Sequence, residues 1–292
     1  MPDLATPSKT IEILKKHNFS LQKKYGQNFI IDRHILEKIV TAAEINKSDC
    51  VLEIGPGIGT MTQYLAESAD KVIAVEIDKK LIPILTETLA GYDNVTIINQ
   101  DILKTDLHKL ISEFGNGNPV KVVANLPYYI TTPIIMSLFE QNLPLNSLTI
   151  MVQKEVAERI KSKPGTKEYG ALSLAVKYYA HPEVIAIVPP ACFIPKPAVS
   201  SAVINLKKHE IPPVNVINEN LLFRIIRAAF NQRRKTLANA LKNVVDLGLT
   251  REHVVSILEV MKLTESIRGE ALSLVEFAEL SNALTKAQTL DH

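Results

Sequence analysis

Short apolar runs alternate with amphipathic stretches between residues 50 and 153. The runs read as buried strands are Cys50–Gly55, Lys71–Glu76, Val95–Asn99, Val120–Asn125 and Ser147–Gln153. The segments TMTQYLAESA and KKLIPILTETLA between them carry a helical pattern. Strands that alternate with helices of this length predict an α/β fold with a parallel, doubly wound sheet. Because the strands are apolar throughout, we expect both faces of the sheet to be covered.

The pattern changes after Val156. Two further strand-like segments, 181–197 and 200–208, follow each other without a helix between them, so we expect an antiparallel pair that finishes the sheet. A Pro- and Asn-rich linker comes next, and the segment Leu221–Leu284 has only helical patterns. The sequence therefore predicts two domains, residues 1–208 and residues 209–292.

Composition excludes several classes of protein. The chain has 292 residues, of which 46% are hydrophobic, which is enough for a sizeable core. No signal peptide is recognisable, and no apolar run approaches the roughly 18 residues that a membrane span needs. The two cysteines, Cys50 and Cys192, lack metal-ligand spacing. We expect a soluble cytoplasmic protein that uses no metal and has no membrane partner.

Charge is unevenly distributed along the chain. The formal net charge is only +2, but residues 49–110 hold ten acidic and five basic residues. Residues 224–242 hold six basic residues and no acidic one. A basic block in a nearly neutral chain indicates an anionic partner that contacts one region only.

A glycine-rich turn, EIGPGIGTMT, follows the first of the five strands. Gly55, Gly57 and Gly59 leave room for a ligand against the backbone. The dinucleotide-binding fingerprint needs its third glycine at the position of Thr60. The tighter spacing seen here is more usual around S-adenosylmethionine. A turn that simply packs a helix on a strand would explain the glycines equally well.

Acidic residues at the next two strand ends strengthen the ligand interpretation. Glu76 lies 21 positions after Gly55, close to the spacing at which an acidic side chain binds a ribose diol. Asp101 follows the third strand and could accept a hydrogen bond from an adenine amino group, and Ile77 and Ile102 could cover the adenine faces. Each acid alone could be a helix cap or a loop end. Ligands of open α/β sheets bind at this edge of the sheet.

The segment NLPYYITTP ends the strand Val120–Asn125. The carbonyl oxygen of the Asn125 side chain can accept one N–H of an amino group, and the backbone carbonyl of Leu126 or Pro127 can accept the other. Pro127 fixes the local backbone, and Tyr128 offers a face on which a base can stack. Phe193 is the candidate for the second face. A strand-end cap for Asn125 and core packing for the two aromatic residues are the structural alternatives.

The chain resembles the ribosomal RNA adenine dimethyltransferases over nearly its whole length, and within them the small-subunit enzymes most. The resemblance rests on KKYGQNFIID, EIGPGIGTMT, VEID, QDIL, NLPYYITTPII, QKEVAERI, KEYGALS, FIPKPAVSSAV and FNQRRKTL. It implies a Rossmann-like class I methyltransferase sheet, mostly parallel with an antiparallel last strand, and a small all-helical C-terminal domain. One departure is that Ser200 stands where the family usually has an acidic residue before serine.

The resemblance also implies an activity and a set of site residues. The expected reaction is S-adenosylmethionine-dependent N6,N6-dimethylation of two adjacent adenosines near the 3′ end of 16S rRNA, in the assembling small ribosomal subunit, by a monomeric enzyme. The residues implied to hold S-adenosylmethionine are Asn28, Ile30, Gly55, Glu76, Asp101 and Asn125, with Gly57, Ile77 and Ile102 beside them. The family's scheme favours the Pro127 carbonyl as the second acceptor.

The basic block is the candidate surface for RNA. If residues 222–242 formed one helix, one face would carry Arg224, Arg227, Arg234, Lys235 and Lys242. Arg233 would then lie on the apolar side, so we expect a break near Asn231. A solvated face would explain the basic residues too, but such faces normally mix signs of charge.

Three alternatives remain at this point. The first is the large-subunit adenine methyltransferase that confers macrolide resistance, which shares the sheet and the Asn-x-Pro-aromatic motif. The second is a DNA adenine methyltransferase, although its usual Asp-Pro-Pro-Tyr box is absent. The third is a ribosome-assembly factor that acts by binding. The intact Asn125, Glu76 and Tyr128 argue against a binding protein without activity.

Overall fold

The computed structural model describes residues 3–115, 117–242 and 250–290. Its strands are β1 (Phe29–Ile30), β2 (Cys50–Ile54), β3 (Lys71–Glu76), β4 (Val95–Asn99), β5 (Val120–Asn125), β6 (Leu145–Gln153), β7 (Ala180–Val188), β8 (Phe193–Ile194) and β9 (Ser201–Lys208). Its α-helices are α1 (Pro7–Lys16), α2 (Arg33–Ala42), α3 (Thr60–Ser68), α4 (Ile82–Thr88), α5 (Leu107–Phe114), α6 (Thr131–Glu140), α7 (Lys154–Lys161), α8 (Ala171–Tyr179), α9 (Glu219–Asn231), α10 (Leu237–Leu241), α11 (Arg251–Val260) and α12 (Leu274–Leu290). Short 3₁₀ turns are η1 (Lys23–Tyr25), η2 (Pro190–Cys192) and η4 (Gly269–Ala271).

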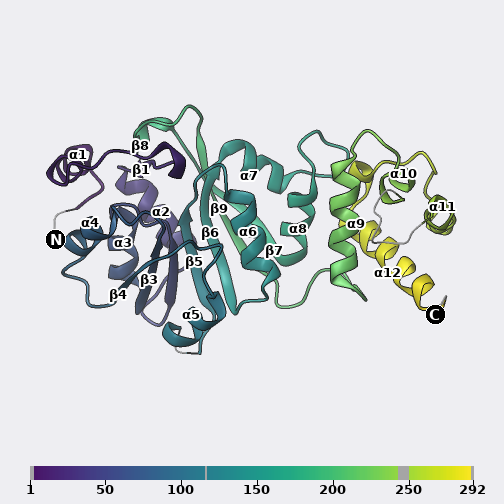
Figure 1. The fold of residues 1–292 in the computed structure, drawn as a ribbon, viewed down its shortest axis with the longest axis horizontal. Coiled ribbons are helices and arrows are strands. Elements are labelled where there is room, and N and C mark those ends of the chain that lie inside the picture. Colours follow the sequence, from purple (N-terminus) through teal and green to yellow (C-terminus); the bar gives the residue numbers. More distant parts are fainter. Residues whose placement is uncertain (1–2, 116, 243–249, 291–292) are drawn as a thin grey trace. The chain divides into compact units, whose positions relative to one another are not determined.

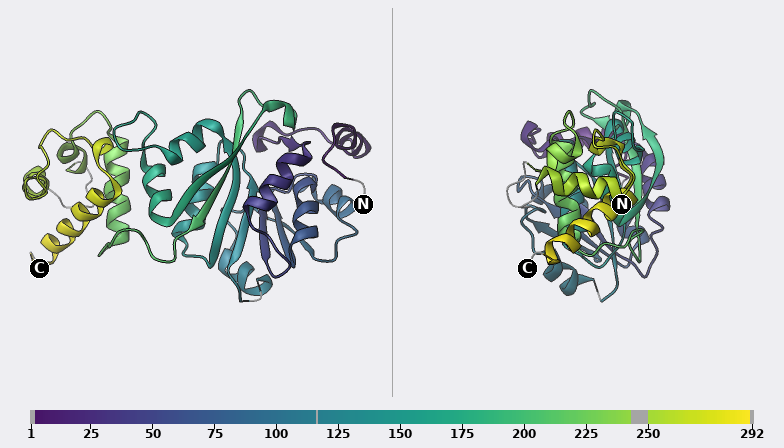
Figure 2. Two further views of the ribbon diagram at one scale, coloured as in Figure 1. Left: turned by 180° about the vertical axis from the view of Figure 1, so that it is seen from behind. Right: turned by 90° about the vertical axis from the view of Figure 1, so that its right-hand side faces the viewer.

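A seven-stranded sheet forms the centre of the fold, in the order β4-β3-β2-β5-β6-β9-β7. The pairs from β4 to β6 are parallel, and β9 runs antiparallel to β6, with Met151 opposite Val203. Helices cover both faces of the sheet, as the front view in Figure 1 and the back view in Figure 2 show. The predicted α/β sheet, mostly parallel with an antiparallel last strand, is confirmed.

The central strands are buried along nearly their whole length. All five residues of β2 are buried, and so are five of the six in β3 and in β5. Val51 and Leu52, which point to opposite faces, both have 0% exposure. Two-sided burial of this kind explains why the strands lack the alternating pattern of a half-exposed sheet.

A second, two-stranded sheet lies apart from the central one. Its strands β1 and β8 are antiparallel, with Phe29 opposite Ile194 and Ile30 opposite Phe193. This pairing holds together two segments that are distant in the sequence, β1 before β2 and β8 before β9.

The contacts between residues divide the chain into two compact units. The first comprises Met1–Ala157 and His181–Lys208, and the second comprises Glu158–Ala180 and His209–His292. The boundary predicted from the sequence, a single one at residue 208, differs from this division, because residues 158–180 group with the C-terminal helices. The cause is aromatic packing: the Tyr169 ring lies 5.7 Å from Phe230, and the Tyr178 ring lies 5.3 Å from Phe223.

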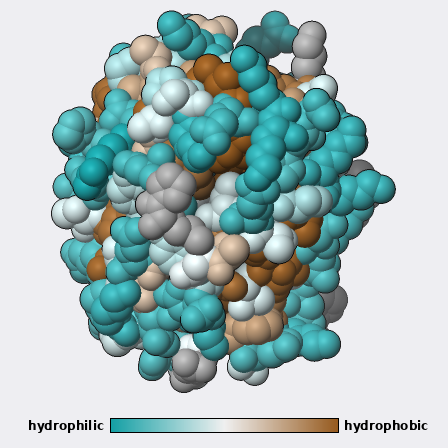
Figure 3. All heavy atoms as spheres, turned by 90° about the vertical axis from the view of Figure 1, so that its left-hand side faces the viewer, coloured by the Kyte–Doolittle hydropathy of each residue, from teal (hydrophilic) through white to brown (hydrophobic). Residues whose placement is uncertain are grey.

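The surface on the face shown in Figure 3 is mainly hydrophilic. On the face in Figure 3, hydrophobic atoms appear in patches among predominantly hydrophilic residues. Among the residues that the structure describes, no helix is long and apolar enough to cross a membrane. The same residues contain no group of three or more histidine, cysteine or acidic side chains that could hold a metal ion.

Candidate functional site

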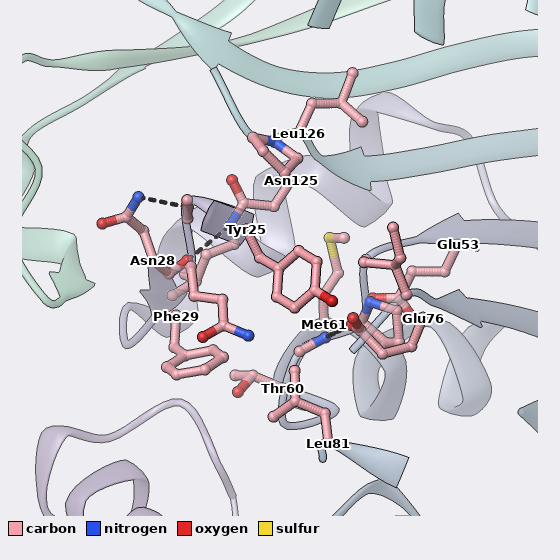
Figure 4. A pocket seen from close by; sticks show the side chains of 18 of the residues that line it. Tyr25, Asn28, Phe29, Glu53, Thr60, Met61, Glu76, Leu81, Asn125 and Leu126 are labelled. Atoms are coloured by element: carbon pink, nitrogen blue, oxygen red, sulfur yellow. Dashed lines mark hydrogen bonds between the residues drawn. The ribbon is translucent and has the colours of Figure 1, made fainter. Parts of the chain in front are cut away.

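A pocket opens at the carboxyl ends of β2, β3 and β5, in the first unit. Its lining includes the predicted residues Asn28, Ile30, Gly55, Gly57, Glu76, Ile77, Asn125, Pro127 and Tyr128. Figure 4 shows Asn28 and Asn125 on one side of the pocket and Glu53 and Glu76 on the other. Residues from four separate stretches of sequence therefore meet in one cavity, at the edge of the sheet where ligands of α/β folds bind.

Two features of the turn after β2 require glycine: its backbone conformation and the lack of space for a side chain. Gly55 and Gly57 have φ angles of +72° and +63°, a region that residues with a side chain rarely adopt. A Cβ atom on Gly57 would lie 3.0 Å from two ring carbons of Phe29. The turn therefore brings bare backbone, including the N–H of Gly57, to the wall of the pocket.

Glu76 ends β3 with its carboxylate held by backbone donors. The side chain is 4% exposed, and it accepts hydrogen bonds from the N–H of Gly57 at 3.2 Å and of Asp78 at 2.8 Å. Burial raises the pKa of Glu76 from its ordinary 4.5 to about 7, although the backbone hydrogen bonds lower it. The carboxylate is thus fixed in direction, as binding of a diol requires.

Glu53 is a pocket residue that the sequence analysis missed. It is fully buried within β2, and neither carboxyl oxygen has a hydrogen-bond partner of good geometry within the described chain. Burial raises its pKa to about 8, and the nearby Thr62 hydroxyl lowers it only in part. A buried, unpaired acid costs free energy, so a cationic ligand in the pocket would gain by interacting with it. An acidic residue inside the apolar run CVLEI was the available signal.

Replacing Glu53 with glutamine is expected to flatten the pH dependence of stability of the unliganded protein. The folded protein holds the Glu53 proton up to about pH 8, whereas the unfolded chain releases it near 4.5. This contribution to stability is complete below pH 4.5 and is lost as the pH rises towards 8. Thermal unfolding of wild type, Glu53→Gln and the exposed control Glu113→Gln between pH 5 and 8.5 measures the slopes. Equal slopes for Glu53→Gln and wild type would contradict the assignment.

The Asn125 carboxamide has a fixed orientation. Its Nδ2 donates a hydrogen bond of 2.9 Å to the backbone carbonyl of Asn28, a contact that only the NH₂ side of the amide can make. The Oδ1 atom is therefore the side of the amide left for a ligand. Asn28 is held in turn, because its own Nδ2 donates to the carbonyl of Gly26 at 3.0 Å.

The structure distinguishes between the two backbone carbonyls after Asn125. The Pro127 carbonyl already accepts from the N–H of Ile130 at 3.2 Å and from Oγ1 of Thr131 at 3.1 Å, at the start of α6. Within the described chain no group donates to the Leu126 carbonyl. A carbonyl oxygen has two lone pairs, and the two hydrogen bonds to the Pro127 carbonyl use both. The geometry therefore favours the Leu126 carbonyl as the second acceptor, in place of the expected Pro127 carbonyl.

The aromatic residues differ in how they are placed. Tyr128 is half-buried and lines the pocket, and its hydroxyl lies 2.9 Å from Oγ of Ser201 at the start of β9. The neighbouring Tyr129 is 59% exposed. Phe193 is 1% exposed in the hydrophobic core and does not line the pocket. The pairing of β8 with β1 buries its ring, so the ring has no free face for stacking in this structure.

Two predicted cofactor residues lie outside the pocket lining. The Asp101 carboxylate accepts a hydrogen bond of 3.0 Å from the N–H of Leu103, which is the loop-end contact considered as its structural alternative. Ile102 is buried, at 6% exposure, whereas Ile77 is 43% exposed and lines the pocket. Of the two isoleucines expected to cover the adenine faces, only Ile77 therefore lies at the pocket.

The structure adds further lining residues to those predicted. They are Tyr25, Gly26, Gln27, Phe29, Glu53, Pro56, Thr60, Met61 and Leu81, and Leu126, already a candidate acceptor, lines the pocket too. Several lie in the segment before α2, where a short 3₁₀ turn and β1 give no periodicity of their own. A pattern-based analysis has no signal for such residues.

The basic block has the break that the sequence predicted. Helix α9 ends at Asn231, and α10 begins at Leu237. Arg233 forms an ion pair with Glu270 at 3.0 Å, which explains a charged residue on the apolar side. The predicted residues Arg227, Arg234, Lys235 and Lys242 are exposed, and Arg224 is half-buried. Residues 230–235 line a surface hollow in the second unit.

Two solved structures with the same fold are methyltransferases. A dimethyladenosine transferase from Plasmodium falciparum superposes with a TM-score of 0.74 at 27% identity, covering 89% of this chain and 98% of the other. The 23S rRNA methyltransferase ErmE superposes with a TM-score of 0.65 at 24% identity, covering 88% and 99%. The fold and pocket therefore define a Rossmann-like class I methyltransferase with a helical C-terminal region.

Sequence comparisons define the family. The model of the family described as ribosomal RNA adenine dimethylase matches residues 18–280. The ribosomal RNA small subunit methyltransferase A of Lachnoclostridium phytofermentans is 60% identical over 97% of this chain and 98% of that protein. Its counterpart in Alkaliphilus metalliredigens is 52% identical over 99% of this chain and 100% of that protein. The chain belongs to the ribosomal RNA adenine dimethylase family and is an rRNA adenine dimethyltransferase.

Proposed function

We propose that this enzyme uses S-adenosylmethionine to dimethylate N6 of two adjacent adenosines near the 3′ end of 16S rRNA, acting in the cytoplasm as a monomer on the assembling small subunit. The observation that carries the proposal is the pair of acceptors at the end of β5, the oriented Oδ1 of Asn125 and the unpaired carbonyl of Leu126. The small-subunit target is supported by the names of relatives 52–60% identical over almost the whole chain.

The pocket fits S-adenosylmethionine in charge and shape. Glu76 offers a carboxylate for the ribose hydroxyls, and the Gly55–Gly59 turn admits a ligand against the backbone. The carboxyl of Glu53 is unpaired and holds its proton in the unliganded protein, and the positive charge of the methionyl ammonium or the sulfonium would favour its ionised form. When bound, S-adenosylmethionine supplies an activated methyl group, so no strong general base is required.

The chain's own contribution at the adenine is positioning. The N6 lone pair is delocalised into the ring, which makes this nitrogen a poor nucleophile. Two acceptors aimed at its N–H groups favour the pyramidal form and direct the lone pair towards the methyl donor. Tyr128, with its hydroxyl held by Ser201, is placed to stack on the base that leaves the RNA.

The second unit is proposed to contact RNA through the turn between α9 and α10 and its flanks. Arg224, Arg227, Arg234, Lys235 and Lys242 would neutralise phosphates, with Arg234 and Lys235 fully on the surface of the turn. In this division of labour, residues 1–208 hold the cofactor and carry the chemistry, and residues 209–292 hold the RNA.

Reversing the charges of Arg234 and Lys235 to glutamate is expected to weaken binding to 16S rRNA by roughly tenfold or more and to reduce its salt slope by about 2. Lys104→Glu with Lys109→Glu, exposed on the first unit, makes the same change in net charge and serves as the control. Titration of both double variants with 16S rRNA at several salt concentrations measures the difference. Equal losses in the two variants would show that only net charge matters and would reject the surface.

Methyl transfer by the purified protein tests the proposed activity as a whole. Small-subunit particles from cells that lack the enzyme, incubated with labelled S-adenosylmethionine, should incorporate about four methyl groups per particle if two adenosines are dimethylated. Large-subunit RNA should remain unlabelled. Labelling of the large subunit instead would favour the macrolide-resistance type of activity.

A further inference from the structure

A buried acid just beyond β3 binds the segment that precedes the sheet. Asp78 is 2% exposed, and its Oδ2 accepts a hydrogen bond of 2.8 Å from Nε2 of Gln27. Nε2 of Gln22 lies 3.2 Å from both carboxylate oxygens. The two glutamines are themselves joined, because the N–H of Gln22 donates to Oε1 of Gln27 at 2.9 Å. Two side chains from a segment with little regular structure thus converge on one carboxylate.

The same acid is joined to both sides of the pocket. Its backbone N–H donates to Oε1 of Glu76 at 2.8 Å, on the side assigned to the ribose. Gln27 is followed by Asn28, whose carbonyl accepts the Nδ2 hydrogen bond that orients Asn125. A continuous set of contacts therefore runs from Glu76 through Asp78 and residues 27–28 to the adenine acceptor.

We propose that Asp78 is a positioning residue that holds residues 22–28 as a wall of the pocket and through Asn28 sets the Asn125 carboxamide for transfer. The inference rests on the proposed function, because it assigns Asp78 a role in the same reaction. Asp78 touches neither the pocket nor the reacting atoms. Its effect on transfer passes through the segment, and in particular through the carbonyl of Asn28.

A purely structural role is the competing account. Oδ1 of Asp78 also accepts from the N–H of Lys80 at 3.1 Å, a local turn contact that would exist without any segment to hold. If that contact were the whole role, the partners from Gln22 and Gln27 would be incidental. The two accounts differ in what happens when the contact to Gln27 is broken and then restored.

The test exchanges donor and acceptor across the Gln27–Asp78 hydrogen bond. In Asp78→Asn an NH₂ group must face either Nε2 of Gln27 or the N–H of Lys80, so one contact is lost. In Gln27→Glu two carboxylates face each other. The double variant pairs the new NH₂ of position 78 with the new carboxylate of position 27, while the acceptors for Lys80 and Gln22 remain. Asp70→Asn, exposed just before β3, is the control for loss of the charge.

The expected result is a loss of kcat that the double variant reverses. Each single variant should lower kcat for methyl transfer to small-subunit particles by roughly tenfold, the effect of one lost hydrogen bond to a charged group. The affinity for S-adenosylhomocysteine should fall less than kcat does. The double variant should regain kcat to within about threefold of wild type. Losses that simply add in the double variant would overturn the proposal, as would a single variant with normal kcat.

Hydrogen exchange separates this inference from the proposed function. The amides of residues 22–28 should exchange faster in both single variants and return towards wild-type protection in the double variant. If the wild-type protein transferred no methyl groups, the proposed function would fail, and exchange would still show whether Asp78 holds the segment. Unchanged exchange in Asp78→Asn would reject the positioning role even if wild-type transfer were normal.

Discussion

Replacing Asn125 with alanine is expected to lower the rate of methyl transfer by about 10²- to 10³-fold, the usual effect of removing one preorganised polar group from an active site. The loss follows from the geometry, because Nδ2 is bound to the Asn28 carbonyl and Oδ1 is the side of the amide left for a ligand. Single-turnover transfer to small-subunit particles measures the rate, and calorimetry with S-adenosylhomocysteine measures cofactor binding.

Cofactor affinity should change by no more than about threefold in Asn125→Ala, because the cofactor is bound mainly by Glu76, at the ribose, and by the backbone of the glycine turn. Asn205→Ala is a matched control, because Nδ2 of Asn205 also donates to a backbone carbonyl, that of Ala42 at 2.7 Å, outside the pocket. A near-normal rate for Asn125→Ala would remove the main support for the assigned chemistry.

Replacing Glu76 with glutamine is expected to weaken S-adenosylhomocysteine binding by roughly 10- to 100-fold, in line with losing charged hydrogen bonds at a buried site. The carboxylate accepts from Gly57 and Asp78, so an amide must turn its NH₂ towards one of these N–H groups or towards the ribose. Either choice removes an acceptor. Calorimetry with the wild type, Glu76→Gln and the exposed control Glu113→Gln provides the comparison.

The pH dependence of this binding has a defined sign. Burial holds the pKa of Glu76 at about 7, so the carboxylate that binds hydroxyl groups becomes more populated as the pH rises through 7. Wild-type affinity should therefore increase from pH 6 to pH 8, and Glu76→Gln should lose part of that increase. An unaltered affinity for Glu76→Gln would show that Glu76 is only a cap for the backbone.

Local patterns predicted the sheet and the half of the site that lies on it. The apolar runs predict β2 to β6 within a few residues. The strands β2, β3, β5 and most of β6 are buried on both faces and read as continuous, whereas the edge strand β4 is only half-buried. Glu76 and Asn125 could be found because each is a polar residue that ends such a run. Their common position at one edge follows from the parallel topology alone.

Two features of the site that the sequence left open are decided by contacts in the folded chain, and a third was missed. Phe193 is buried because β8 pairs with β1 across more than 160 residues of sequence, and no local pattern reveals that pairing. The preference for Leu126 over Pro127 depends on two hydrogen bonds at the start of α6. Glu53 was missed because an acid inside an apolar strand runs against the usual pattern of burial. The first two features need the folded chain, whereas Glu53 left a signal in the sequence.

The positions of the methyl groups in ribosomal RNA test the central claim most directly. RNA from cells with and without this protein, and from cells that carry Asn125→Ala, can be digested and mapped by mass spectrometry. We predict N6,N6-dimethyladenosine at two adjacent positions near the 3′ end of 16S rRNA, present with the wild-type protein and absent in the other two strains. Unchanged dimethylation without the protein, or its loss from 23S rRNA alone, would contradict the account.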